Sequence, residues 1–171
     1  MFERAGGTFG GDYAFDRYLV DLRGHQSLGR DMRFDVRARL GSTDGTLPSQ
    51  YLYDLGGIST IRGYDYKAFT GDRMMWFNAE YWFDNDLWHN QWPMEMFSIG
   101  AFFDAGSAWF SQAPATLIGG QTGSGGIQTK MDIRSSAGVG GKIGDLRAYF
   151  ARQLDSTNKD WQVSFRFDRT F

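Results

Sequence analysis

The sequence predicts an all-β protein, an antiparallel transmembrane β-barrel of about eight strands. Three observations lead to this fold class. Apolar and polar residues alternate along much of the chain, which is typical of strands whose two faces meet different solvents. No segment has the periodicity of a long helix, and no apolar run approaches the roughly 18–20 residues that a membrane helix needs. The connections between the expected strands alternate between short and long, as they do in membrane barrels.

Two segments show the alternation most clearly. In MRFDVRARL (32–40) every second residue is apolar and the residues between them are charged. In WQVSFRFDRTF (161–171) the side chains of Phe165, Phe167 and Phe171 share one face, and polar side chains occupy the other. The same pattern predicts strands at 2–11, 18–26, 74–84, 96–110, 133–143 and 146–154, of which 2–11 has the weakest alternation.

The connections differ in length in a regular way. Residues 144–145 form a short turn, whereas 41–73 and 111–130 are long and rich in glycine and polar residues. If the last strand ends on the periplasmic side, both long connections fall on the outer side, which is the arrangement of bacterial outer-membrane barrels. We therefore expect one outer-membrane β-barrel domain, residues 1–171, with a long inserted loop at 41–73.

Composition argues against several classes of function. The net charge is −2 and the basic residues are spread among acidic ones, so no nucleic-acid partner is expected. The chain has no cysteine, which excludes disulfides and thiol chemistry. Its two histidines, His25 and His89, lie at or near predicted turns without a serine-nucleophile motif, so we expect no enzyme, no cofactor and no metal site. The aromatic content of 17% fits the interfacial girdles of a membrane barrel, and it also fits a carbohydrate-binding sandwich.

The two ends of the chain carry different signals. The start, MFERAGGTFGG, lacks the apolar core of a signal peptide. A protein that works beyond the inner membrane is then expected to be a mature form, an engineered form or the C-terminal part of a longer chain. At the other end, Phe165, Phe167 and Phe171 form an apolar face that resembles the recognition signal of bacterial outer-membrane barrels. Assembly machinery reads such a last strand through its unpaired backbone groups.

A glycine-rich stretch and two strand motifs resemble a known family. They are GGISTIRGY (56–64), NAEYW (78–82) and FFDAG (102–106), in this order and followed by the terminal aromatic residue. Together they resemble the C-terminal barrel of the outer-membrane assembly and secretion superfamily, also called the bacterial surface antigen family. The resemblance extends from about residue 13 to residue 171. It implies a location in the bacterial outer membrane, contact with the lipid bilayer, and polypeptide substrates or the barrel assembly machinery as partners.

The family also implies that Arg62 returns into the barrel on its loop and pairs with acids of the inner wall. The alternation supports this independently, because Glu80 and Asp104 both fall on the inward face of neighbouring strands. One guanidinium group has enough donors for both carboxylates. Gly63 would allow a tight turn beside the arginine, with Tyr64 completing the motif. The alternative is an exposed loop arginine above two solvated acids.

The number of strands leaves the closure of the barrel open. Family barrels have sixteen strands, and a closed eight-stranded barrel is filled by its own side chains. The chain could form half of a sixteen-stranded wall with a second copy or another chain, be a piece of a longer protein, or close alone with the loop across its mouth. The charged residues expected to face inward favour a wide, wet lumen. They are Asp21, Arg23, Arg33, Asp35, Arg37, Arg39, Glu80, Asp104, Arg134, Lys142, Arg147, Arg166 and Asp168.

Two classes of function follow from these features. The first is an integral outer-membrane barrel that inserts polypeptides into the outer membrane or moves them across it, or else a minimal or oligomeric barrel or pore without assembly activity of its own. The second is a soluble β-sandwich that acts as a binding module. Partition into detergent and heat-modifiable migration on gels would distinguish the barrel from the sandwich.

Overall fold

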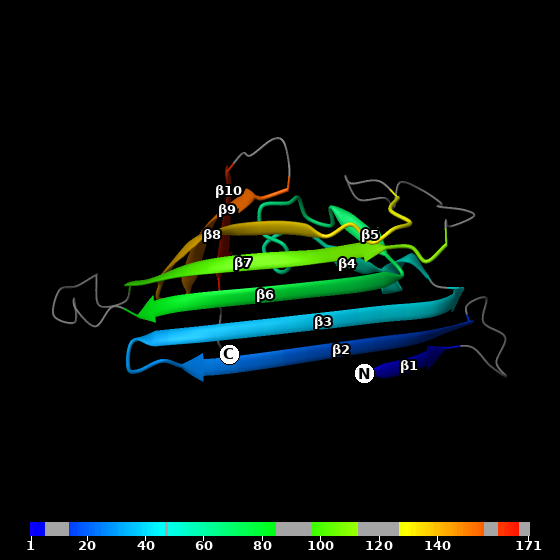
Figure 1. Ribbon diagram of the computed structural model, residues 1–171, viewed down its shortest axis with the longest axis horizontal. Helices are drawn as coiled ribbons and strands as arrows, with labels where there is room; N and C mark the ends of the chain where they lie inside the picture. The colour runs from blue at the N-terminus through cyan, green and yellow to red at the C-terminus, as the bar shows by residue number, and fades with distance from the viewer. Residues whose placement is uncertain (6–13, 47, 85–96, 113–126, 156–160, 168–171) are drawn as a thin grey trace.

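Eight strands form one antiparallel sheet in which every strand pairs with its neighbours along the sheet (Figure 1). The computed structural model describes residues 1–5, 14–46, 48–84, 97–112, 127–155 and 161–167. The sheet order is β1-β2-β3-β6-β7-β8-β9-β10, a meander that confirms the predicted all-β antiparallel fold and excludes two packed sheets of a sandwich. The strands are β1 (Phe2–Ala5), β2 (Ala14–Ser27), β3 (Met32–Thr46), β6 (Arg73–Asp84), β7 (Phe97–Trp109), β8 (Arg134–Ile143), β9 (Leu146–Gln153) and β10 (Trp161–Phe167).

The two faces of this sheet differ in character. One face carries large apolar side chains that no other part of the described chain covers, each between 38% and 65% exposed. These residues alternate along the strands and line up across the sheet, as Val20 does with Leu40 and Phe150 with Val163. A surface of this kind suits contact with lipid. The set includes Val20, Leu22, Leu40, Phe77, Ile99, Phe103, Val139, Phe150, Val163 and Phe165.

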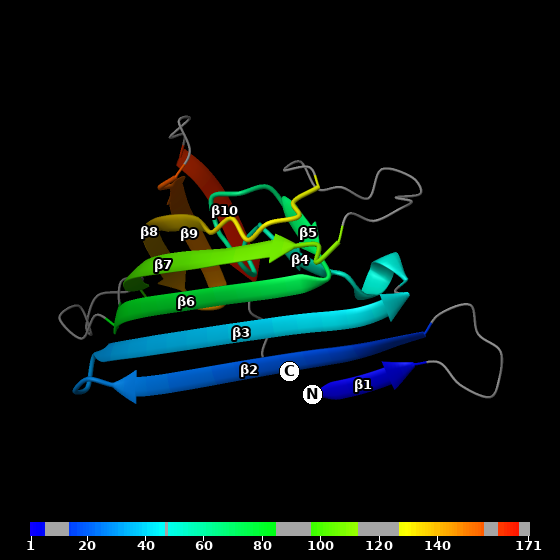
Figure 2. The ribbon, with the colours of Figure 1, turned by 45° about the vertical axis from the view of Figure 1, so that its right-hand side comes forward.

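The opposite face, called the inner face below, is partly covered by the segment between β3 and β6. This inner loop (residues 48–72) contains a single turn of 3-10 helix (Ser49–Tyr51) and a small two-stranded sheet of β4 (Tyr53–Leu55) and β5 (Phe69–Gly71). Figures 1 and 2 show β4 and β5 lying over one end of the large sheet. Among the described residues, no helix is long and apolar enough to cross a membrane.

The inner loop is shorter than the predicted 41–73. Strand β3 continues to Thr46, because residues 41–46 pair through their backbones with the first residues of β2, down to Ala14. The sequence GSTDGT at 41–46 has no apolar alternation, yet backbone pairing needs none where neither face must bury apolar surface. Gly41 also lies under the ring of Tyr53, where an added Cβ would come within 2.6 Å of a ring carbon.

Two buried clusters attach the inner loop to the sheet. In the first, Tyr53, Leu55, Ile61, Tyr64, Ala68 and Phe69 of the loop pack against Met74, Trp76 and Ala108 of the sheet. In the second, Trp82, Phe102, Tyr149 and Ala151 of the sheet pack together, with Ile58 of the loop against them. Gly138 makes room for this second cluster, because a Cβ there would lie 2.7 Å from the ring of Phe102.

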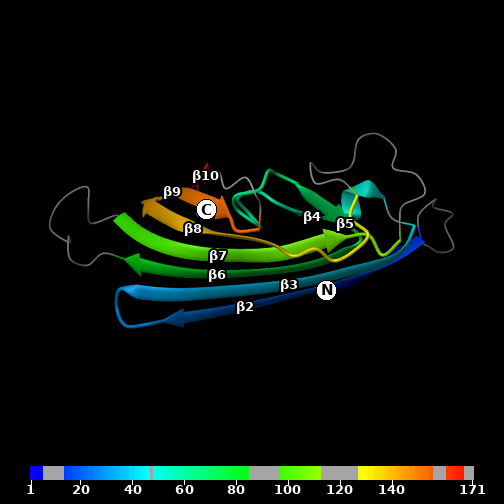
Figure 3. The same ribbon diagram turned by 45° about the horizontal axis from the view of Figure 1, so that its top comes forward.

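The sheet is curved, with β8, β9 and β10 bending over the side that carries the inner loop (Figure 3). Strands β1 and β10 are its two edges, and among the described residues no pairing joins them. The inner loop occupies the space on the concave side, which a tight eight-stranded barrel would fill with side chains. Residues 6–13 of the predicted first strand and residues 168–171 of the last lie outside the described part of the chain.

Candidate functional site

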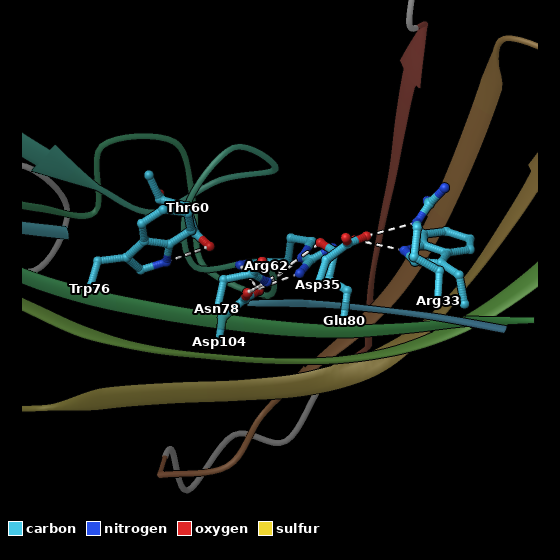
Figure 4. A network of polar contacts seen from close by, with 9 residues as sticks. Arg33, Asp35, Thr60, Arg62, Trp76, Asn78, Glu80 and Asp104 are labelled. Atoms are coloured by element: carbon cyan, nitrogen blue, oxygen red, sulfur yellow. Dashed lines mark hydrogen bonds and ion pairs between the residues drawn. The ribbon is translucent and has the colours of Figure 1, made fainter. Parts of the chain in front are cut away.

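Arg62, at the tip of the inner loop, contacts two acids of the sheet (Figure 4). Its Nε donates to Asp104 Oδ2 at 2.8 Å and its Nη2 donates to Asp104 Oδ1 at 2.9 Å, a bidentate arrangement. Its Nη1 lies 2.8 Å from Glu80 Oε1. The backbone N–H of Arg62 also donates to Asp104 Oδ2, at 3.1 Å. We call these three residues the arginine clasp.

The clasp lies almost entirely out of solvent. The side chain of Arg62 is 3% exposed, that of Asp104 0% and that of Glu80 16%. The guanidinium carbon lies 3.6 Å from the ring centre of Phe102 and 4.8 Å from that of Tyr149, so two aromatic faces stabilise the cation. Burial by itself lowers the pKa of Arg62, but the hydrogen bonds and charge of Asp104, with the charge of Glu80, raise it above its ordinary value.

Neighbouring side chains complete the hydrogen bonds of both acids. Asn78 Nδ2 donates to Asp104 Oδ1 at 2.7 Å, so that carboxylate accepts four hydrogen bonds in all. Trp82 Nε1 donates to Glu80 Oε2 at 2.8 Å. Each carboxylate therefore has a hydrogen-bond donor from the sheet in addition to its contacts with Arg62 of the loop.

The loop backbone presents Arg62 through a tight turn. Gly63 has a φ of 91°, a conformation that side chains with a Cβ rarely adopt. The N–H of Gly57 donates to the carbonyl of Tyr64 at 3.0 Å, which closes the turn. Trp76 Nε1, from the sheet, donates to the carbonyl of Thr60 at 3.0 Å and holds the loop from the other side (Figure 4).

A second set of contacts joins the tip of the loop to the last strands. Gln153 Nε2 donates to the carbonyl of Gly63 at 2.6 Å, and the hydroxyl of Tyr64 donates to Asp155. Gln162 Nε2, on β10, donates to Asp65 of the loop at 3.3 Å. Burial and the hydrogen bond to Asp155 raise the pKa of the Tyr64 hydroxyl. The inner loop therefore bridges the middle of the sheet and the strands next to its C-terminal edge.

The structure brings together most of the residues singled out in the sequence. Arg62, Glu80 and Asp104 meet in one cluster, and Gly63 and Tyr64 lie beside it. Phe165 and Phe167 lie together on the exposed apolar face of β10, whereas Phe171 lies outside the described residues. His25 is part of β2 and contacts Asp35, and His89 lies outside the described residues. In the described part of the chain, no group of three or more potential metal ligands is close enough to hold an ion.

The sequence analysis assigned no role in the site to several residues that contact Arg62, its acids or the tip of the loop. Asn78 and Phe102 share the inward face with Glu80 and Asp104, so the alternation could have identified both. Tyr149 and Gln153 also fall on the inward face of their strand, but the alternation does not show that they reach the loop, and Asp155 lies beyond the predicted strand 146–154. They reach the loop only because the sheet curves, which brings the last strands over the loop tip.

Comparison with protein families matches residues 1–169 to the Omp85 superfamily domain. The chain belongs to the Omp85 superfamily. Among solved structures, this Omp85 chain is similar to BamA from Haemophilus ducreyi, crystallised without POTRA domains 1–3, with a TM-score of 0.70 and 14% identity over 92% of the chain. It is also similar to CdiB from Acinetobacter baumannii, with a TM-score of 0.54 and 18% identity over 90% of the chain.

These similarities show the fold, and they cover only part of each known protein. The Omp85 chain spans 35% of the BamA chain and 26% of the CdiB chain. Among curated protein sequences, none matches it.

Proposed function

We propose that this chain forms part of an outer-membrane β-barrel that inserts polypeptides into the bacterial outer membrane or moves them across it. Residues 1–171 are one barrel domain in this proposal, with the bilayer around its apolar face. Membership of the Omp85 superfamily and the likeness to BamA and CdiB support it. The function needs no covalent chemistry and no cofactor, because the work is binding, opening and release.

The observation that carries the proposal is the docked inner loop. A loop held on the inner face by Arg62, Asp104 and Glu80 occupies the space through which a polypeptide would pass. Removing one partner of such a buried ion pair costs about 3–5 kcal/mol, because the other charge stays buried and uncompensated, so the docked loop depends on all three residues. A substrate that offers compensating contacts would lower that cost.

The edges of the sheet supply the other half of the mechanism. Strands β1 and β10 are its edge strands, and an edge with unpaired backbone groups pairs readily with another strand. The loop contacts β10 through Asp65 and Gln162, and it contacts the sheet next to β10 through Gly63 and Gln153. Release of the clasp would therefore loosen this edge, where a seam could open for a substrate strand.

A second candidate is a barrel or pore without assembly activity of its own. The size of the sheet favours it: eight strands with a loop on their concave side leave room for a wider wall, completed by a second copy, another chain or a longer form of this one. In this case the partner is the other part of the wall, and the clasp has a structural role.

Reconstitution into liposomes tests the two candidates. The assay follows the insertion of an unfolded outer-membrane protein by its heat-modifiable migration on gels. Wild-type chain should speed insertion over empty liposomes, and Arg62→Met should change that rate. The matched control is Arg4→Met, which alters an exposed arginine that makes its own bidentate pair with Asp16. Rates equal to those of empty liposomes for every form would favour the second candidate.

A further inference from the structure

The inner faces of β2 and β3 carry an unbalanced set of charges. Along these two strands, five arginines and two aspartates share the inner face. Arg23 stands directly opposite Arg37 in the strand register, a like-charged pair that is unfavourable without an anion between them. The seven residues are Arg17, Arg23, Arg33, Arg37, Arg39, Asp21 and Asp35.

The single carboxylate of Asp21 forms ion pairs with three of these arginines. Arg37 Nη2 lies 2.6 Å and Arg23 Nη2 lies 3.1 Å from Asp21 Oδ2. The Nε of Arg39 is buried, lies 3.7 Å from the same oxygen and has no hydrogen-bond partner among the described residues. Both oxygens of Asp21 already accept from Arg37 and Arg23, so it has no capacity left for Arg39. We call Arg23, Arg37 and Arg39 the arginine patch.

A hollow lined by Arg23 and Arg37, two members of the patch, is open to a ligand. It has a volume of about 310 Å³ and reaches from Arg23 to Glu80 of the arginine clasp. The side chain of Arg23 is 68% exposed at its edge. Figure 4 shows Arg33 and Asp35 beside Glu80, on the same face as Arg62, so the arginine-rich area adjoins the clasp. Its polar lining consists of Arg23, His25, Asp35, Arg37, Asn78 and Glu80.

We propose that the arginine patch binds the carboxylates of an acidic segment of the polypeptide substrate. This inference rests on the proposed function and names the substrate class that the inner wall would favour. A carboxylate matches the fork of an arginine side chain, as Asp21 already shows with Arg37. A second carboxylate in the hollow would bind the exposed guanidinium group of Arg23, and the nearby positive charges of Arg37 and Arg39 would add to the attraction.

The position of the patch favours a polypeptide over a lipid headgroup. The three arginines lie on the inner face, opposite the exposed apolar side chains of β2 and β3 such as Val20 and Leu40. A lipid headgroup would reach the rim of the apolar face, whereas a chain passing along the inner wall meets the patch directly. Glu80 and Asp35 at the far end of the hollow would repel an acidic segment from the clasp and leave it at the arginines.

Peptide binding to the full chain in an uncharged detergent tests the inference. The probe is a fluorescein-labelled peptide of alternating Glu and Ser, followed by fluorescence anisotropy, with the Gln and Lys versions of the same peptide as comparisons. We expect the Glu peptide alone to bind, and added salt to weaken it. The double variant Arg23→Gln and Arg39→Gln should weaken binding by about tenfold or more, since it removes two positive charges, one of them on the exposed donor Arg23, but leaves the Asp21–Arg37 pair intact.

The control is Arg4→Gln, which removes the same charge from the opposite face and should leave the affinity unchanged. Equal binding of the Glu, Gln and Lys peptides, or equal weakening by Arg4→Gln, would overturn the inference. Binding of short-chain phosphatidylglycerol that requires Arg23 and Arg39, without binding of the Glu peptide, would assign the patch to lipid and also overturn it. The liposome assay with Arg62→Met measures the proposed function independently of peptide binding. Failure of the proposed function can therefore be distinguished from failure of this inference.

Discussion

Replacing Arg62 by methionine should release the inner loop from the sheet. The substitution removes three guanidinium contacts to two carboxylates and two cation–π contacts, while it keeps a side chain of similar length. Asp104, fully buried, would keep only the backbone N–H of residue 62 and Asn78 as donors. An uncompensated buried charge of this kind costs about 3–5 kcal/mol, which corresponds to a shift of roughly a hundredfold to several thousandfold in the docking equilibrium.

Cysteine labelling measures this shift cleanly, because the chain has no cysteine of its own. Ser136 is fully buried under the loop tip, and a Cβ added to Gly63 would lie 3.4 Å from the Cβ of Ser136. A Ser136→Cys background should react slowly with a maleimide in detergent while the loop is docked. Adding Arg62→Met should raise that rate by a factor of the same order as the change in the docking equilibrium, provided that opening and closing are fast compared with labelling.

Two further variants make the experiment decisive. Arg4→Met in the same background removes an exposed arginine–aspartate pair and should leave the labelling rate unchanged. Adding Asp104→Leu to Arg62→Met removes the stranded charge and should slow labelling again, since an apolar pair tolerates burial. If Arg62→Met labels at the wild-type rate, the loop is held by its apolar contacts and the reasoning about the clasp is refuted.

Three more predictions concern the other members of the site. Asp104→Asn should speed the labelling of the Ser136→Cys form more than Glu80→Gln does. The reason is that Asp104 is 0% exposed and accepts three hydrogen bonds from Arg62, whereas Glu80 is 16% exposed. Equal effects of the two variants would contradict this order. Gly63→Ala should destabilise the docked loop by roughly 1–2 kcal/mol through its φ of 91°, measured as faster protease cleavage of the loop, and unchanged cleavage would argue against strain. Because the pKa of Tyr64 is raised, the folded state keeps the tyrosine proton above pH about 10 while the unfolded state loses it, so thermal stability should fall above that pH. Tyr64→Phe should flatten this dependence in thermal melts between about pH 8 and 11. An unchanged slope would contradict the contribution of Tyr64 and Asp155.

The fold was largely predictable from the local sequence pattern. A strand that separates lipid from an aqueous interior must alternate apolar and polar side chains, so the eight strands and their two faces could be identified one segment at a time. The prediction was wrong for residues 41–46, which were assigned to the long loop but belong to β3. Residues 41–46 extend β3 without alternation, because they pair with β2 through their backbones.

The amino-acid sequence alone determined which face each charged residue occupies, since the period of two is a property of the extended backbone itself. It therefore placed Glu80 and Asp104 on one face, and the motif around Arg62 indicated what they would meet. Only the tertiary structure decided the rest. The contacts of Arg62 with the rings of Phe102 and Tyr149, and the contact from Tyr64 to Asp155, depend on sheet curvature and on loop docking. The sharing of Asp21 among three arginines depends on the register in which β2 pairs with β3. Those are sums of many small contacts between distant segments, and no local pattern encodes them.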